Sequence, residues 1–280
     1  MNFTVIFVVI CSSVKAERMK YFGLLIVLIS YFSINAQEIA APLFSKIPLK
    51  AETFVGVDEF QSVYYINNNI LYKKSKTKTF SYSNFSLGKI TTVNIQNPFK
   101  LILFYQDFNA VMIVDNNLNE LTEKIDFTEE TLFNNVLYVT GSSQNNIWLY
   151  ADDNKLHLYD YNTLSEQTQT QPLTFYEEDY FPKTIISTYK NVWILSNAGV
   201  LQFNEYGNFI DTFEKAGIDR IYPFKKNYIF SESASFFYQK EKATIPITLN
   251  HSHLIKDVSV NNAYISIYDG EFIYQYELNI

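Results

Sequence analysis

Residues 191–203 read NVWILSNAGVLQF, and this short stretch decides the fold. Two apolar runs flank a turn of Ser, Asn, Ala and Gly, which predicts a strand, a tight turn and a second strand. Another turn over 205–208 and a third strand over 209–213 follow. A related stretch, NIWLYADDNKLHLYD, lies upstream at residues 146–160. Their tryptophans, Trp148 and Trp193, are 45 residues apart, which suits one β-propeller blade of about 40–45 residues.

Six such units can be aligned along the chain. Their second strands are centred on Tyr64, Ile102, Trp148, Trp193, Ile229 and Tyr264, with spacings of 38, 46, 45, 36 and 35 residues. Each unit shows short alternating apolar runs between Asn, Asp and Ser clusters, with no sustained helical period. We therefore predict an all-β chain with six four-stranded blades. In the second blade the predicted outer strand covers residues 121–127.

The last unit offers three strands, over 255–260, 264–268 and 272–278. We expect the missing outer strand near the N-terminus, where residues 45–49 (SKIPL) resemble residues 243–247 (ATIPI) of the fifth blade. Both segments place Pro where only an edge strand tolerates it, because Pro lacks the N–H that a sheet ladder needs. Pairing of 45–49 with 272–278 would close the ring and hide sheet edges.

Composition limits the class of protein. The 280 residues suit one large all-β domain, which we assign to 37–280. Aromatic residues make up 17% and pack well on pleated, half-buried surfaces. With only 8 Gly, turns must depend on Asn and Asp, which tolerate left-handed backbone. The net charge of −7 argues against nucleic acid as a partner, because sequence-independent binding needs a basic surface.

The N-terminus has the pattern of a secretory signal peptide. Met19-Lys20 precedes an apolar run over 21–34 and then Asn35-Ala36-Gln37, so we expect cleavage after Ala36. The leader then spans 1–36, and its removal takes away three basic residues and one acidic residue, which leaves a net charge of −9. The apolar run is too short to predict a membrane span, and none is expected in the mature chain.

A second apolar stretch over 2–10 leaves the start of the chain open. Either the leader is bipartite or translation begins at Met19, and we favour the later start. The one cysteine, Cys11, falls in the leader, so the mature domain has no disulfide and no thiol chemistry. Lipidation of Cys11 is disfavoured because the residue before a lipidated Cys is normally small, and Ile10 is not.

The blade around Trp193 resembles a known repeat. Trp193-Ile194, then Gly199-Val200-Leu201-Gln202-Phe203 and Gly207-Asn208-Phe209, is similar to the repeat of bacterial two-component-regulator-type propellers. That repeat reads aromatic–Ile–Gly–Thr, a turn, Gly–Leu and an aromatic residue, then Gly–Lys–Phe. Leu195-Ser196 replaces Gly–Thr here, and the other blades match less closely. The resemblance implies an extracytoplasmic propeller used for sensing or protein docking, and it carries over no catalytic residues.

Polar clusters between strands supply the candidate partner-binding residues. The densest acidic stretch is Glu177-Glu178-Asp179-Tyr180, between the third and fourth blades, in a connection where propellers commonly dock partners. We expect it to share one rim with the other candidates, which are Asp219, Arg220, His251, His253, Asp152 and Asp153. Paired carboxylates can also catalyse glycoside hydrolysis, but adjacent loop residues lack the opposed geometry that this chemistry requires.

Three further patterns have simpler interpretations. The aromatic residues at the centres of the second strands, including Tyr64 and Tyr264, predict packing between blades. Residues 152–154 and 115–117 contain Asp and Asn, but they lack the loop pattern of a calcium site and suit hairpin turns. The pair His251 and His253 could meet one metal ion from a strand, yet no third ligand is near in sequence, so we predict a solvated loop and no metal site.

Taken together, the sequence predicts a non-catalytic, exported propeller that serves as a binding, sensing or assembly module in the bacterial envelope, with a protein or peptide partner and no cofactor. It contains no nucleophile elbow, phosphate-binding loop or dinucleotide fingerprint. The alternative is a lyase-type or glycosidase-type enzyme with acidic and His residues at the channel mouth. A third alternative is an outer-membrane assembly factor that offers sheet edges to client strands. A deep pocket with converging His, Asp and Arg would favour catalysis.

Overall fold

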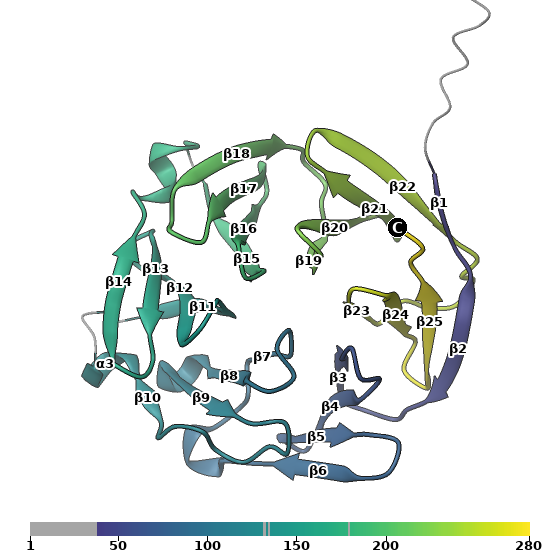
Figure 1. The fold of residues 1–280 in the computed structure, drawn as a ribbon, viewed down its shortest axis with the longest axis horizontal. Coiled ribbons are helices and arrows are strands. Elements are labelled where there is room, and N and C mark those ends of the chain that lie inside the picture. The colour runs from purple at the N-terminus through teal and green to yellow at the C-terminus, as the bar shows by residue number, and fades with distance from the viewer. Residues whose placement is uncertain (1–37, 131–132, 134, 179) are drawn as a thin grey trace, which may run out of the picture. The chain divides into compact units, whose positions relative to one another are not determined.

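The computed structural model describes residues 38–130, 133, 135–178 and 180–280. These residues form six sheets arranged around a ring, which confirms the predicted six-bladed β-propeller (Figure 1). In each blade the first strand lies towards the centre of the ring and the last strand lies at its perimeter (Figure 1). The predicted leader and Gln37 lie outside the described residues.

The first three blades follow one another along the chain. Blade one contains β3 (Thr53–Val57), β4 (Val63–Asn67), β5 (Ile70–Lys74) and β6 (Thr79–Tyr82). Blade two contains β7 (Thr92–Asn94), β8 (Leu101–Tyr105), β9 (Ala110–Val114) and β10 (Ile125–Asp126). Blade three contains β11 (Val136–Gly141), β12 (Asn146–Ala151), β13 (Leu156–Asp160) and β14 (Ser165–Gln169).

The last three blades complete the ring. Blade four contains β15 (Pro182–Ser187), β16 (Asn191–Ser196), β17 (Gly199–Asn204) and β18 (Phe209–Glu214). Blade five contains β19 (Arg220–Phe224), β20 (Asn227–Glu232), β21 (Ser235–Lys240) and β22 (Ala243–Leu249). Blade six contains β23 (Asp257–Val260), β24 (Tyr264–Tyr268), β25 (Phe272–Glu277) and, from the other end of the chain, β2 (Leu43–Pro48).

The described helices are short and lie in the connections. They are η1 (Phe85–Leu87), η2 (Gln106–Phe108), α3 (Phe127–Glu130) and η3 (Leu173–Phe175). Among the described residues no helix has the length and hydropathy needed to cross a membrane.

The predicted N-terminal strand closes the ring. Strand β2 pairs antiparallel with β25, with Lys46 opposite Tyr274 and Pro48 opposite Phe272. The Ser45 hydroxyl donates to Gln275 Oε1 at 2.6 Å across a separation of 230 residues. Pro48 lies at the end of this outer strand, where the missing N–H removes no ladder bond that the sheet needs. The prediction of a closing strand is therefore confirmed, with a start slightly earlier than expected.

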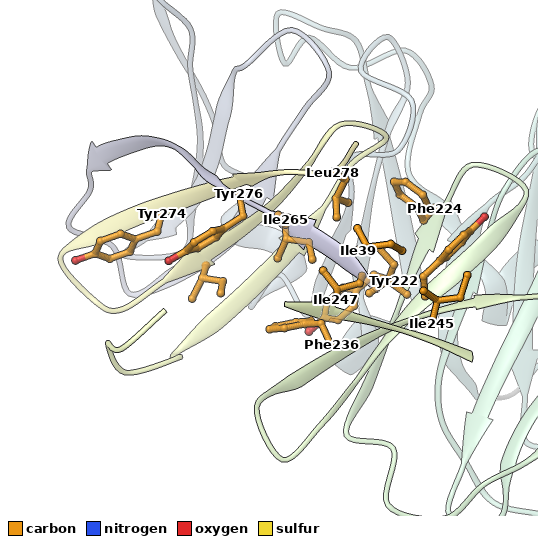
Figure 2. Packing of buried hydrophobic residues seen from close by; sticks show 14 residues of the cluster. Ile39, Tyr222, Phe224, Phe236, Ile245, Ile247, Ile265, Tyr274, Tyr276 and Leu278 are labelled. Carbon is orange, nitrogen blue, oxygen red and sulfur yellow. The ribbon is translucent and has the colours of Figure 1, made fainter. Parts of the chain in front are cut away.

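Strand β1 (Ile39–Ala41) was not anticipated. It pairs in parallel with β22, the outer strand of blade five, and gives that blade a fifth strand. Because β1 leads directly into β2, a single segment joins the outer edges of blades five and six (Figure 1). Ile39 and Ala41 are buried against both blades, in the cluster that Figure 2 shows.

The outer strand predicted over 121–127 is mostly wrong. Asp115 bends the chain early, since its carboxylate accepts hydrogen bonds from the backbone of Asn117 and Asn119, both at 2.8 Å. The ladder is then reduced to an isolated bridge and to β10, which has two residues. Asp126 also accepts a bond from the Thr128 backbone, which starts α3 instead of extending the strand.

The core consists of packing layers between neighbouring blades. Tyr64 packs against blade two, Trp148 against blade four and Trp193 against blade five, and all three are buried. The prediction that this aromatic stripe fills the space between blades is confirmed for these residues. Tyr264 differs, because it is half-buried and its ring lies 4.8 Å from that of Phe44.

Candidate functional site

Strand alternation gives the ring two faces. The turns that join the inner strand to the second strand of each blade lie on one face, which we call the inner-turn face. The turns between second and third strands lie on the opposite face, together with the crossings from one blade to the next. We call this the crossover face. The assignment holds for every blade because consecutive antiparallel strands reverse direction.

The predicted partner-binding residues that the structure describes belong to the crossover face. They lie in the blade crossings that precede β15, β19 and β23, at the first residue of β19 and in the β12–β13 turn. A backbone bond from Leu173 to the Asn154 carbonyl, at 2.8 Å, connects one crossing with that turn. The residues are distributed over several blades, so the structure places them on a common face without gathering them into one pocket.

The acidic stretch between blades three and four is partly structural. Glu178 is exposed and Glu177 is half-buried, whereas Asp179 lies outside the described residues. Tyr180 is only 2% exposed, and its hydroxyl donates to the Ile194 carbonyl at 2.6 Å. Burial raises the pKa of Tyr180 to about 12. The expectation that Tyr180 contacts a partner is therefore corrected, because its ring is buried among residues of blades three and four, beneath the surface that a partner would meet.

The β12–β13 turn holds a buried histidine. Asp152 and Asp153 are exposed, as expected for a hairpin turn, and Asn154 adopts a left-handed conformation with φ 64°. His157 lies below them with Nε2 3.0 Å from Asp153 Oδ1 and Nδ1 2.8 Å from Glu166 Oε1. Asp153 is thus engaged with a side chain of its own blade.

The other two candidate pairs also have partners within the chain. The Arg220 guanidinium donates to Asp257 Oδ1 at 2.6 Å, and this bond raises the pKa of Arg220. Asp219 accepts from the Ser233 backbone at 2.8 Å. These bonds tie blade five to blade six and fix a turn, which leaves Asp219 and Arg220 exposed but already paired.

His251 and His253 belong to an aromatic cluster on the closing blade. Their rings lie 5.6 Å apart, and His253 stacks on Tyr274 at 4.7 Å. Nδ1 of His251 lies 2.7 Å from the Tyr276 hydroxyl. Burial, and then the neighbouring His253, lower the pKa of His251. Throughout the described ranges no group of three or more His, Cys, Asp or Glu side chains could hold a metal ion.

A cavity of about 510 Å³ is lined by inner strands and by the turns that follow them, so it lies at the centre of the ring and opens on the inner-turn face. We call it the mouth, and none of the predicted partner-binding residues lines it. Its walls come from the inner strands and carry apolar side chains: Val55, Val93, Ile95, Val258 and Val260. Its rim comes from the first turns of blades one, two, four, five and six. A volume of this size is in the range of ordinary ligand pockets.

Exposed aromatic rings stand on the rim of the mouth. Phe60 and Phe99 are 62% and 61% exposed, and their rings meet edge to face with centroids 5.8 Å apart. Tyr189, on the turn of blade four, is also exposed. Large apolar side chains at three points of one opening are a feature of binding surfaces, because a monomer gains nothing from leaving them in water.

The polar groups of the rim are largely satisfied within the chain. Asn261 donates to the carbonyls of Val57 and Asp58, both at 3.2 Å, and accepts from two backbone N–H groups of its own turn. Asn262 accepts from the Lys225 backbone and donates to Glu59. Asp58 accepts from three donors, including the Tyr64 hydroxyl at 3.0 Å. The mouth is therefore an apolar well with a polar rim that is mostly self-paired.

A weak signal for the mouth exists in the sequence. Phe60 and Phe99 follow predicted inner strands and lie in turns, where an aromatic residue has no packing role, and Tyr189 is the last residue of the inner strand predicted for blade four. They are separated by 39 and 90 residues along the chain. Only the closed ring shows that these three turns surround one opening.

Comparison with known proteins identifies the fold and no closer kinship. No family model and no curated protein matches the chain. Among solved structures, the Pan2 WD40 domain of Neurospora crassa is 10% identical, with a TM-score of 0.54, and the match covers 82% of this chain and 75% of that one. BBS1N, solved in complex with ARL6DN, is 13% identical with a TM-score of 0.54 over 80% and 77% of the two chains.

An enzyme also has this fold. A catalytically inactive virginiamycin B lyase from Staphylococcus aureus, solved with quinupristin, is 11% identical with a TM-score of 0.54, over 84% of this chain and 99% of that one. At such identities the likeness establishes a WD40-like β-propeller fold. It does not choose between binding and catalysis, because one fold supports many functions.

Proposed function

We propose that the protein is a non-catalytic binding module whose partner is a protein that inserts apolar side chains into the mouth. The observation that carries this proposal is the combination of exposed Phe60, Phe99 and Tyr189 with apolar walls and a self-paired polar rim. Burial of apolar surface contributes about 25 cal/mol per Å², so such an opening favours an apolar insert.

The same features disfavour a polar substrate. A sugar needs free hydrogen-bond donors and acceptors, whereas the amides of Asn261 and Asn262 are already occupied. Among the described residues that line the mouth there is no His and no Arg beside the carboxylates of Asp58 and Glu59. A catalytic propeller is expected to have His, Asp and Arg side chains that converge on a pocket. The support for the mouth as a site comes instead from its exposed aromatic rings and apolar walls.

The proposed location is the bacterial envelope, reached by export. Its support is the signal-like sequence up to Ala36. N-terminal sequencing of the protein from its native host should begin at Gln37. Recovery of the intact chain from the cytoplasm, with Met19 still present, would contradict export.

The binding proposal is tested by quantitative affinity capture from envelope extracts with the tagged mature protein. The double variant Phe60→Ala/Phe99→Ala should reduce recovery of the main co-purifying protein by at least tenfold, since central aromatic residues of an interface commonly contribute about 2 kcal/mol. The matched control is Phe175→Ala/Phe181→Ala, which removes two rings from the crossover face that are somewhat more exposed, at 74% and 70%.

The control also tests the face that the sequence predicted. If the control variant loses the partner while the Phe60/Phe99 variant keeps it, docking belongs to the crossover face. If the wild-type protein retains no protein above the level of an untagged extract, the binding module itself is contradicted.

A further inference from the structure

The perimeter of the ring has an open groove between blades four and five. It has a volume of about 320 Å³. We call it the side groove and define it by Trp193, Val200, Gln202, Asp211, Phe213 and Tyr228. It is separate from the mouth, because its walls come from second, third and outer strands instead of inner strands.

Blade five has an equivalent surface in the same register. In blade four Trp193 lies opposite Gln202, which lies opposite Asp211, and Val200 lies opposite Phe213. In blade five Ile229 lies opposite Tyr238, which lies opposite Ile245, and Phe236 lies opposite Ile247. Val200 and Gln202 are the second and fourth residues of β17, as Phe236 and Tyr238 are of β21. The two sets therefore occupy corresponding positions.

In blade five this surface is covered by the chain itself. Its five residues pack in one buried cluster with Ile39 and Ala41 of β1. Figure 2 shows Ile39 between Ile247 of blade five and Leu278 of blade six. Strand β1 runs parallel to β22, with Ile39 opposite Ile247. The molecule thus shows what fills such a groove: an extended segment with two inward side chains, two residues apart.

In blade four the corresponding surface has an unused hydrogen-bond donor. Trp193 is 1% exposed, and its indole Nε1 has no hydrogen-bond partner in the part of the chain that the structure describes. An unsatisfied buried donor is unfavourable, because it has lost its hydrogen bonds to water and gained none in return. Strand β18 is also the last described strand of its sheet, so its outer edge is open.

We propose that the side groove binds an extended, uncharged segment of a partner protein, which adds in parallel to β18 as β1 adds to β22. Val200 and Phe213 form the apolar wall and take an aliphatic side chain. Asp211 and Gln202 take an uncharged side chain with a hydroxyl or amide group, such as that of Ser, Thr or Asn, two residues before the aliphatic one on the same side of the strand. Addition of a strand to a sheet edge is a general mode of peptide recognition.

The charges around the groove support an uncharged segment. Asp211 and Glu241 lie near Lys242, which leaves little net charge for a strongly acidic or basic ligand to complement. The polar residues Gln202 and Asp211 stand where blade five has Tyr238 and Ile245. Ile39 and Ala41 lie opposite Ile247 and Leu249, so this β1 pair does not meet the row of Tyr238 and Ile245. The side chain that the ligand offers to Gln202 and Asp211 therefore has no counterpart in that pair.

Selection from a library of random nine-residue peptides displayed on phage tests the proposal. The mature wild-type protein is the bait, and each enriched peptide is then measured against two variants. Asp211→Arg places a long charged side chain over the groove, and Thr212→Arg places the same side chain on the adjacent residue of β18, outside the groove lining. We expect at least tenfold weaker binding to Asp211→Arg and less than twofold change for Thr212→Arg.

The indole N–H groups give a direct readout. The protein has two tryptophans, so a ¹⁵N-labelled sample gives two indole signals, which the variant Trp148→Phe assigns. A selected synthetic peptide should shift the Trp193 signal and slow its exchange with solvent, while the Trp148 signal stays in place. This result would not depend on the partner of the mouth, so the two proposals can fail separately.

Three outcomes would overturn the proposal. Enrichment of no peptide, or of peptides that bind Asp211→Arg as well as wild type, would show that the groove is not the site. Enriched sequences without an aliphatic residue two positions from an uncharged polar one would contradict the stated chemistry. Enriched sequences matching residues 38–42 of this chain would assign the groove to a second copy instead.

Discussion

At the scale of single residues, Tyr180 shows how a crossing is anchored to a blade. Its hydroxyl donates to the carbonyl of Ile194 on β16 and accepts from the N–H of Leu201 on β17 at 3.3 Å. Tyr180→Phe should lower the free energy of unfolding by about 1 kcal/mol, the usual contribution of one hydrogen bond. Chemical denaturation measures this, with Tyr206→Phe at an exposed turn as the control. Equal stability of both variants would show that the Tyr180 bonds contribute nothing.

The same tyrosine predicts a loss of stability at alkaline pH. The pKa of Tyr180 is about 12 in the folded protein and lies near 10 in an unfolded chain. Between these values the unfolded state has released the proton and the folded state has not, so stability falls as pH rises from about 10 to 12. Over this pH range, the melting temperature of Tyr180→Phe should fall less steeply with pH than that of the wild type. Parallel curves would contradict the assignment.

His251 predicts the opposite trend at acidic pH. Its pKa is lowered in the folded protein, mainly by burial, so the unfolded state binds the proton first as pH falls. Stability should therefore decrease as pH falls through about 6.5, the ordinary His value, and level off below the folded pKa. His251→Asn should reduce this dependence in thermal melts from pH 7.5 to 5. His253→Asn, at the exposed neighbour, provides the comparison, and an unchanged slope for His251→Asn would contradict the prediction.

At the scale of the elements, two hairpin glycines should differ in how well they tolerate an added Cβ atom. Gly199 starts β17 with φ +148°, and a Cβ there would lie 2.1 Å from the Phe213 carbonyl oxygen. Gly270 also has positive φ, but its Cβ would meet only the end of the Lys256 side chain at 3.8 Å. Gly199→Ala should destabilise the protein by about 3 kcal/mol or more, from backbone strain plus the clash, whereas Gly270→Ala carries strain alone, about 1 kcal/mol. Denaturant titration of both variants distinguishes the cases, and equal losses would contradict the role of the clash.

The closing strand makes an element-scale prediction as well. Deletion of residues 37–50 removes β1 and β2, uncovers the edge of β25 and reopens the surface that Ile39 and Ala41 cover. The variant should melt at a lower temperature and associate between chains, because open sheet edges pair with one another. Calorimetry and light scattering measure the two effects. A monomeric variant as stable as the parent would show that the ring does not depend on this segment.

At the scale of the whole molecule, covalent closure should strengthen the ring. Pro48 and Phe272 lie opposite each other at the end of the β2–β25 ladder. Pro48→Cys/Phe272→Cys should form a disulfide on oxidation and raise the free energy of unfolding by about 2–4 kcal/mol, because the bond encloses a long loop of the unfolded chain. The reduced form of the same variant is the control. Failure to crosslink would contradict the observed register.

The sequence alone predicts the blade pattern, but it does not predict which residues form the mouth. Trp148 and Trp193 mark repeats because their packing role is local to neighbouring strands, and Pro48 marks an edge strand through its missing donor. Asp115 was understood as a turn residue, yet its side-chain bonds also shortened the outer strand of blade two. Phe60, Phe99 and Tyr189 could not be grouped in advance, since they meet only when distant turns are brought around one opening.

The unanticipated β1 has the same cause. Its pairing with β22 depends on a parallel contact across about 208 residues, for which no local pattern gives a signal. Likewise, Arg220 on the crossover face looked free because its partner, Asp257, comes from the next blade. The local role of a residue can be inferred from the sequence, whereas contacts between blades can be identified only in the folded ring.

The order in which the chain is made has a consequence for the closing strand. Strand β2 leaves the ribosome early, and its partner β25 is synthesised more than 220 residues later. At about 5–20 residues per second, β2 waits on the order of ten to forty seconds without its neighbour. During that interval its apolar side chains and open backbone are available to any passing chain. A propeller closed in this way therefore cannot complete its fold until the last blade has been translated.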